Sequence, residues 1–277
     1  MGGHPVIACY RGADSADAVV LAALLAGALD ERLVLAGTYE DEPVGLSLGG
    51  LPAADNDGRA DAARALLQPA RELVAAGTNV RQMIVPATDT AQALAGLARN
   101  VHACLLSVGR DTSGRVTRSL LSRVTCPVAV APVSVPAPPT LRRIGVAYDG
   151  STTAQRALVA ASELALAARA QLVMLSAGRT PELAAVWLQI GHLALGRTSH
   201  EARPLVGPAG EALATASANL DLLVCGTRGR GRSPGAILGS VSGHLVAHAR
   251  CAVLVVPYGS GGRGSGPLGL APAAARA

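Results

Sequence analysis

The stretch that decides the fold is Cys225-Gly226-Thr227-Arg228-Gly229-Arg230-Gly231-Arg232-Ser233-Pro234-Gly235-Ala236-Ile237-Leu238-Gly239-Ser240-Val241-Ser242. It follows an apolar run, 222–225, which predicts a buried strand, and it precedes residues 243–249, which predict a helix. Glycines let the backbone of such a loop approach a ligand closely, and the start of a helix offers amides without intrahelical partners. Arg228, Arg230 and Arg232 add positive charge beside them. The stretch therefore predicts an anion-binding turn, most simply for a polyphosphate.

Outward from this turn, short apolar runs alternate with segments of helical periodicity along the chain. The expected strands are 6–10, 32–39, 80–85, 103–108, 128–131, 144–148, 171–176, 202–206, 222–225 and 252–256. Such alternation is typical of parallel strands joined by crossover helices. The sequence therefore predicts an α/β fold of two tandem, open, parallel five-stranded sheets with helices on both faces, of the Rossmann-like type.

Proline and glycine mark the expected domain boundaries. Four prolines occur in the nine residues 132–140, which excludes a helix or a central strand there. We therefore expect a first domain at 1–132, a linker at 133–140 and a second domain at 141–257. Residues 258–277 are mostly Gly, Ser, Pro and Ala without periodicity, and we expect a disordered tail.

Several motifs of the second half resemble the universal stress protein family. The spacing Gly226-x2-Gly229-x9-Gly239-Ser240 is similar to the G-x2-G-x9-G-[S/T] nucleotide loop of its ATP-binding branch. Val146-Ala147-Tyr148-Asp149-Gly150-Ser151 is similar to the family's opening V-x-x-D-G-S, and residues 221–226 and 251–257 resemble its fourth and fifth strands. The resemblance extends over residues 5–257 and implies two such domains in tandem.

The resemblance also implies a ligand and its contacts. In the second domain, ATP would lie at the carboxyl ends of the strands, with Ala147 and Asp149 on the adenosine side and Ala177 beside the adenine. The phosphates would be held by the loop and the helix start: Gly226, Thr227, Arg228, Gly229, Arg230, Gly231, Arg232, Gly239, Ser240 and Val241. Magnesium could accompany the phosphates. Two simpler interpretations stay open: Asp149 as a turn or capping residue, and the loop as a plain connection.

Internal comparison of the halves predicts that they differ in binding. Residues 9–12 match 147–150, and residues 126–132 match 251–257, which indicates a duplication. From Gly109 to Cys126 the chain advances 17 positions, whereas the matching interval from Gly226 to Cys251 is 25, so the first loop is shorter by 8. Arg115 stands in the place of Ser240. We therefore expect the first domain to have lost nucleotide binding and the second to retain it.

The amino-acid composition argues against several classes of ligand and partner. Arginine supplies all 24 basic residues, and the absence of lysine excludes a Walker A loop and Schiff-base chemistry. The net charge of +5 comes from the second half, and with four Tyr and one Trp there is no aromatic stacking platform, so we expect no nucleic acid partner. The cysteines and histidines lack metal-ligand spacing, so no resident metal is expected.

The same features set the expected location and role. No signal peptide and no run of ~20 apolar residues are seen, so we expect a cytoplasmic protein without membrane contact. Few acidic residues fall near the loop, which favours an ATP binder, at most a slow ATPase, over an efficient enzyme. The resemblance implies regulation of a stress or dormancy response, through an unknown protein partner, by a homodimer joined at residues 253–256. Two alternatives remain: a ligand-free scaffold, and a catalytic adenine-nucleotide enzyme of the same superfamily.

Overall fold

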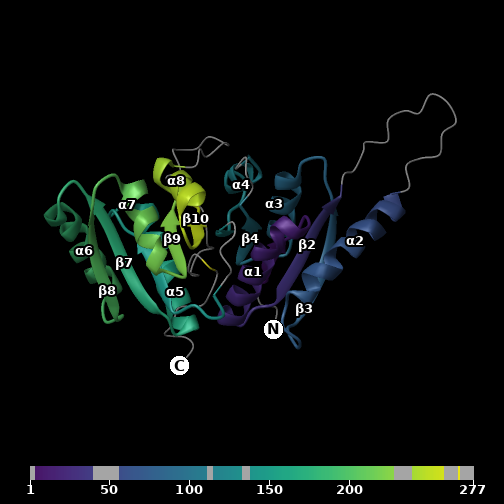
Figure 1. Cartoon of the computed structure of the whole chain (residues 1–277), viewed down its shortest axis with the longest axis horizontal. Coiled ribbons are helices and arrows are strands. Elements are labelled where there is room, and N and C mark those ends of the chain that lie inside the picture. The colour runs from purple at the N-terminus through teal and green to yellow at the C-terminus, as the bar shows by residue number, and fades with distance from the viewer. Residues whose placement is uncertain are drawn as a thin grey trace.

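The chain folds into one continuous sheet with helices on both of its faces (Figure 1). The structure is a computed structural model and describes residues 4–39, 56–110, 115–132, 138–227, 239–258 and 268. Five of the residues expected to contact phosphates, Arg228 to Arg232, therefore lie outside the described residues, as does the acidic segment 40–55.

Ten strands and eight α-helices are present in the described residues, and they alternate within each half, with β5 followed by β6 where the halves meet. The strands are β1 (Val6–Cys9), β2 (Leu33–Tyr39), β3 (Val80–Pro86), β4 (Leu105–Gly109), β5 (Val128–Ala131), β6 (Arg143–Ala147), β7 (Gln171–Gly178), β8 (His200–Val206), β9 (Leu222–Gly226) and β10 (Ala252–Val256). The helices are α1 (Ala16–Leu29), α2 (Asn56–Glu72), α3 (Thr90–Asn100), α4 (Arg115–Leu121), α5 (Thr152–Ala168), α6 (Pro181–Leu195), α7 (Ala209–Ala216) and α8 (Ser240–His248).

The strand order confirms the expected fold class and corrects one part of it. The order is β3-β2-β1-β4-β5-β10-β9-β6-β7-β8, so each half has the same internal arrangement, and all pairs within a half are parallel. The expected pair of separate sheets is instead one ten-stranded sheet, because β5 and β10 pair antiparallel, with Val253 opposite Val130 and Val255 opposite Val128. The strands of the two halves consequently point in opposite directions.

This central pairing also corrects the expected dimer contact. Residues 253–256 were expected to join two chains. In the structure β10 has β9 on one side and β5 of the same chain on the other, so both of its edges are already hydrogen-bonded. A second chain cannot extend the sheet at β10.

Two helical layers cover the sheet and build the core. The buried clusters assign α1, α2, α5 and α6 to one face and α3, α4, α7 and α8 to the other. Alternate residues of the inner strands serve the two faces, as Val224 and Cys225 of β9 illustrate, and these strands are largely buried, which is usual for parallel sheets covered on both sides. The two edge strands, β3 and β8, are partly exposed.

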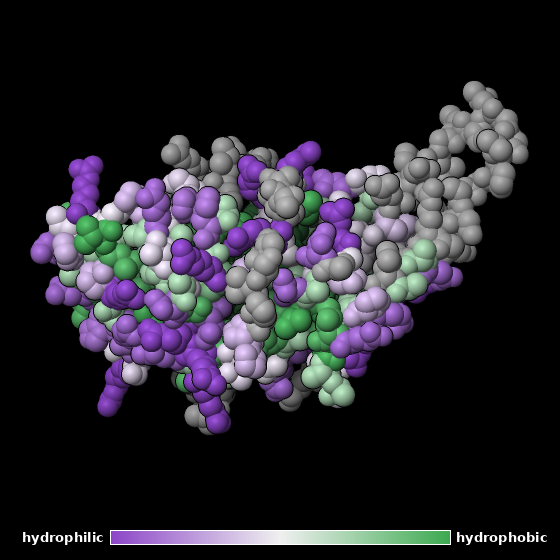
Figure 2. All heavy atoms as spheres, viewed as in Figure 1, coloured by the Kyte–Doolittle hydropathy of each residue, from purple (hydrophilic) through white to green (hydrophobic). Residues whose placement is uncertain are grey.

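Among the helices, α6 is unusual because much of its apolar surface stays exposed. Leu183, Val186, Trp187, Ile190 and Leu193 all lie on it, and Leu193 is 79% exposed. Figure 2 shows apolar surface at this end of the molecule. No helix among the described residues is long and apolar enough to cross a membrane.

The expected linker and tail lie largely outside the described residues. Two residues of the expected tail are described: Tyr258, which is 59% exposed, and Leu268, which is fully buried and belongs to the same core cluster as α1 and α5. The expectation of a disordered tail stays a prediction.

Candidate functional site

A pocket of about 190 Å³ opens at the carboxyl ends of β6, β7 and β9. In the sheet β6 stands between β7, the next strand along the chain, and β9, which is added later on the other side. Strand order therefore reverses between β6 and β9, and in open α/β sheets the crevice at such a reversal is where ligands bind. Its location alone makes this pocket the leading candidate site.

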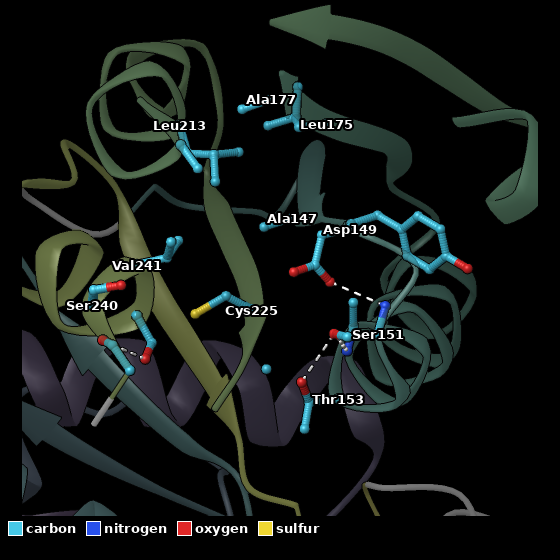
Figure 3. A pocket seen from close by; sticks show the side chains of 16 residues that line it. Ala147, Asp149, Ser151, Thr153, Leu175, Ala177, Leu213, Cys225, Ser240 and Val241 are labelled. Atoms are coloured by element: carbon cyan, nitrogen blue, oxygen red, sulfur yellow. Dashed lines mark hydrogen bonds between the residues drawn. The ribbon is translucent and has the colours of Figure 1, made fainter. Parts of the chain in front are cut away.

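Seven of the thirteen sequence-predicted site residues line this pocket (Figure 3). They are Ala147, Asp149, Ala177, Gly226, Gly239, Ser240 and Val241. They come from the ends of three strands and the start of α8, and Figure 3 places Ser240 and Val241 across the pocket from Asp149. Asp149 and Ser242, which are 93 positions apart in the sequence, thus line the same cavity.

Thr227 is described but is not among the lining residues. It is buried, and its backbone N–H donates to the carbonyl oxygen of Val256 at 3.0 Å. This amide, which was expected to face phosphate, is used to hold the end of β9 beside the end of β10.

Asp149 shapes the turn that leads from β6 into α5. Its Oδ1 accepts a hydrogen bond from the backbone N–H of Ser151 at 3.1 Å, and the Ser151 hydroxyl accepts from the N–H of Ala154 at 3.2 Å as the helix cap (Figure 3). The turn interpretation of Asp149 is therefore correct for one carboxylate oxygen, and the cap is Ser151. Because the residue also lines the pocket, a ligand role remains compatible with this geometry.

Gly226 has a packing reason to be glycine. A Cβ at this position would lie 2.5 Å from the backbone oxygen and 2.7 Å from the carbonyl carbon of Thr153. The matching Gly109 of the first half is also tight, with the Asp14 backbone oxygen 3.1 Å from a Cβ. In each half the end of the fourth strand thus passes close to the start of the helix that follows the first strand, and the contact is tighter at Gly226 than at Gly109, independently of any ligand.

The start of α8 supplies the polar wall. Gly239 is the N-cap residue and has no side chain to accept from the amides of the first turn. The side chain of Ser242 instead donates to the Gly239 carbonyl at 3.2 Å. An uncapped helix N-terminus carries partial positive charge from its amides, which suits an anion.

Sequence reasoning missed the apolar wall and several hydroxyl groups. The additional lining residues are Tyr148, Ser151, Thr153, Ala154, Leu175, Ala209, Leu213, Cys225 and Ser242. Ser151 and Thr153 could have been inferred because they directly follow the Asp149 turn. Leu213 carries no such signal, since its helical spacing is the same as that of an ordinary core residue. Burial raises the pKa of the Cys225 thiol to about 12, so this thiol is neutral at physiological pH.

The single tryptophan of the chain lies against the same turn. A Cβ on Gly150, which has a φ of +76°, would overlap the ring of Trp187. Gly150 lies between two lining residues, and the Trp187 residue is 40% exposed, so its emission should respond to events at the turn.

The described residues contain no group of three or more His, Cys, Asp and Glu side chains able to hold a metal ion. Asp221, the other acidic residue near β9, lies at the opposite end of the strand. Its Oδ2 accepts from the backbone amides of Arg142 and Arg143 at 2.6 and 2.8 Å, so it ties β9 to β6.

Comparison with known proteins adds a family match and several fold matches. Residues 194–257 match the Universal stress protein family model. A universal stress protein from Archaeoglobus fulgidus DSM 4304 has a TM-score of 0.68 at 17% identity, covering 91% of this chain and 95% of its own. A functionally unknown protein from Pseudomonas aeruginosa PAO1 has a TM-score of 0.63 at 17% identity, covering 92% and 93%. These two likenesses show that nearly the whole chain shares its fold with solved structures.

A shorter structure aligns with part of the chain. A universal stress protein in complex with cAMP is 29% identical over 42% of this chain and 96% of its own, with a TM-score of 0.37. No curated protein matches the sequence.

Proposed function

We propose that this chain is a tandem universal stress protein that binds ATP in its second half and acts as a nucleotide-dependent regulator. The single observation that carries the proposal is the pocket at the strand-order reversal, where Asp149, Ala177 and the start of α8 meet. The family match at residues 194–257 includes β9, α8 and β10, which build one side of this pocket.

The shape of the pocket suggests how the nucleotide would lie. About 190 Å³ is less than the ~300–1,000 Å³ of sites that enclose a drug-sized ligand, so the pocket would enclose the adenosine part only. Leu175, Leu213 and Ala177 would contact the base, and Asp149 would accept from a ribose hydroxyl. The triphosphate would extend past Gly226 to the amides of Ser240 and Val241.

The first half is proposed to lack this function. Its helix α4 begins at Arg115, in the place that Ser240 has in α8, and Arg11 stands in the place of Asp149. Because a nucleotide is held by several hydrogen bonds that each contribute ~1 kcal/mol, a loop shorter by eight residues removes much of the binding energy.

A binder fits the pocket better than an efficient enzyme does. Asp149 is the one carboxylate among the described lining residues, whereas metal-dependent phosphoryl transfer usually needs a base and further metal ligands. We expect any Mg²⁺ to arrive with the phosphates, because Mg²⁺ commonly takes only one or two protein ligands in such sites. A homodimer, if formed, must use a surface other than β10, and the exposed apolar side chains of α6 offer one.

Titration calorimetry with ATP tests the proposal. The wild-type chain should bind one ATP, and Gly239→Val, which places a branched side chain at the start of α8, should abolish binding. The matched control is Gly114→Val, at the position in the first half that corresponds to Gly239, and it should leave binding unchanged. Absence of heat in the wild type would favour the ligand-free scaffold, and release of pyrophosphate with a second substrate would favour the adenylating enzyme.

A further inference from the structure

Arg110 of the first half donates side-chain hydrogen bonds across the central seam, into the second half. This residue directly follows Gly109 at the end of β4, where the shortened loop begins. One terminal nitrogen, Nη1, donates to the carbonyl oxygen of Ala247 at 3.0 Å, and Nη2 donates to that of Ala249 at 3.0 Å. Both carbonyls belong to the C-terminal end of α8, in the other half.

These two hydrogen bonds provide partners for carbonyl groups at the C-terminal end of the helix. The last carbonyls of an α-helix lack intrahelical partners and carry partial negative charge, so a cation that donates to them stabilises the end. A guanidinium does this with a planar fork of fixed geometry, which restricts both position and rotation of the helix end. Burial lowers the pKa of Arg110, but a guanidinium stays charged under all ordinary conditions.

The held helix is also the one that forms the polar wall of the pocket. With nine residues, α8 is about 13 Å long, so its two ends are separated by fewer than three helical turns. Ser240, Val241 and Ser242 at its start line the pocket, whereas Arg110 holds its end. A shift or rotation of the C-terminal end therefore moves the amides that face the ligand.

The matching position in the second half has a different residue and a different contact. Gly109 corresponds to Gly226, so Arg110 corresponds to Thr227, whose N–H donates to Val256 in its own half. The pair of hydrogen bonds from Arg110 to the end of α8, here called the clamp, is thus found at the shortened loop and has no counterpart at Thr227. The contact is possible because β5 and β10 are antiparallel, which places the carboxyl end of β4 at the same end of the molecule as the C-terminus of α8.

We propose that Arg110 is a positioning residue for the second-half nucleotide site and that the first half serves that site by clamping α8. The inference rests on the proposed function, because it assigns the first half a part in the same binding event. It predicts that ligand affinity in one half depends on a side chain of the other that never touches the ligand.

The test compares Arg110→Ala and Arg110→Lys with wild type and with Arg123→Ala. Arg123 is the matched control because it lies in the same half and its described contacts are to Asp89 at 2.8 Å and Ser119 at 2.6 Å, away from α8. Two quantities are measured at a temperature well below unfolding for every variant: the ATP dissociation constant, and hydrogen exchange of the α8 amides without ligand.

We expect Arg110→Ala to raise the ATP dissociation constant by about tenfold and to speed exchange in α8, since two charge-assisted hydrogen bonds are lost. Arg110→Lys keeps the charge but not the fork and should recover part of both effects. Arg123→Ala should change neither. If Arg110→Ala binds ATP like wild type, or if Arg123→Ala weakens binding equally, the inference is wrong while the proposed function stands; if wild type binds no ATP, the proposed function itself fails.

Discussion

At the scale of single residues, glycine in this chain has separable roles. Gly226 belongs to the nucleotide-loop spacing, yet the backbone of Thr153 already excludes a side chain there. Gly109 meets a milder form of this constraint, from the Asp14 backbone oxygen, in the half that is proposed to lack a ligand. The glycine that begins the loop is therefore required by strand–helix packing, and it gives no support to ligand binding by itself.

This packing makes Gly226→Ala a test of stability. The added methyl group would press on the Thr153 backbone, which cannot move aside as a flexible side chain could, and overpacking of this kind costs about 1–3 kcal/mol. Urea unfolding should show a loss in that range for Gly226→Ala and a smaller one for Gly109→Ala, where the nearest atom is 3.1 Å away. Equal losses would show that the closer contact is not the cause.

Asp149 allows the turn and the ligand roles to be separated. Asp149→Asn keeps an oxygen that can accept from the Ser151 amide, so the turn should be retained, whereas Asp149→Ala removes that bond as well. We expect both variants to weaken ATP binding, and only the alanine variant to lower thermal stability measurably, by about 1 kcal/mol. A wild-type affinity in Asp149→Asn would leave the carboxylate with its turn role alone.

Site residues could be predicted from the sequence where a short motif fixes their position. Asp149, Gly239 and Ser240 stand in fixed positions of short motifs, and each lines the pocket. Thr227 stands in the same motif, but its amide bonds to Val256, a partner that only the folded sheet brings near. Leu213 could not have been identified, because an apolar residue facing a cavity and one facing the core follow the same periodicity.

At the scale of elements, helix caps offer a paired test. The Ser151 hydroxyl caps α5 and lines the pocket, whereas the Asp89 carboxylate caps α3 in the first half by accepting from the amides of Ala91 and Gln92. Replacing either residue with alanine should lower the free energy of unfolding by about 1 kcal/mol. Calorimetry should then find weaker ATP binding for Ser151→Ala only. Weaker binding in both variants would mean that general loss of stability is the cause.

The bounds of several elements follow closely from the sequence. The predicted ranges 128–131 and 252–256 agree with β5 and β10, because these apolar runs are uninterrupted and flanked by turn residues. In contrast, α8 begins at Ser240, three residues before the predicted start, since an N-cap glycine followed by Ser and Val gives a weak helix signal. The pairing of β5 with β10 joins residues more than 120 positions apart, and the apolar sequences of these two strands do not indicate which strand each one pairs with.

At the scale of the whole molecule, buried thiols predict a sensitivity to alkali. All five cysteines are free, and burial raises the pKa of each thiol, to about 12 for Cys126, Cys225 and Cys251 from an ordinary value of 9.0. The folded state therefore keeps protons that the unfolded state loses above pH 9. This contribution to stability is fully present below pH 9 and declines as the pH rises towards 12.

The measurement is urea unfolding at several pH values between 8 and 11. Above the pKa that the thiol has in the unfolded state, each such thiol should make the free energy of unfolding fall more steeply with pH, by about 1 kcal/mol per pH unit. Cys225→Ala removes one thiol and should flatten the slope by that amount. An unchanged slope would mean that this thiol ionises equally in both states.

The two halves form one sheet but are proposed to have different tasks, one holding the nucleotide and the other holding α8. Photoaffinity labelling with 8-azido-ATP, followed by mass-spectrometric peptide mapping, tests this division most directly. We predict labels confined to the second half, in peptides containing Ala147 to Ser151, Ala177 or Leu213, and suppressed by excess ATP. Labels around Cys9 to Arg11 in the first half, or labels that excess ATP does not suppress, would contradict the account.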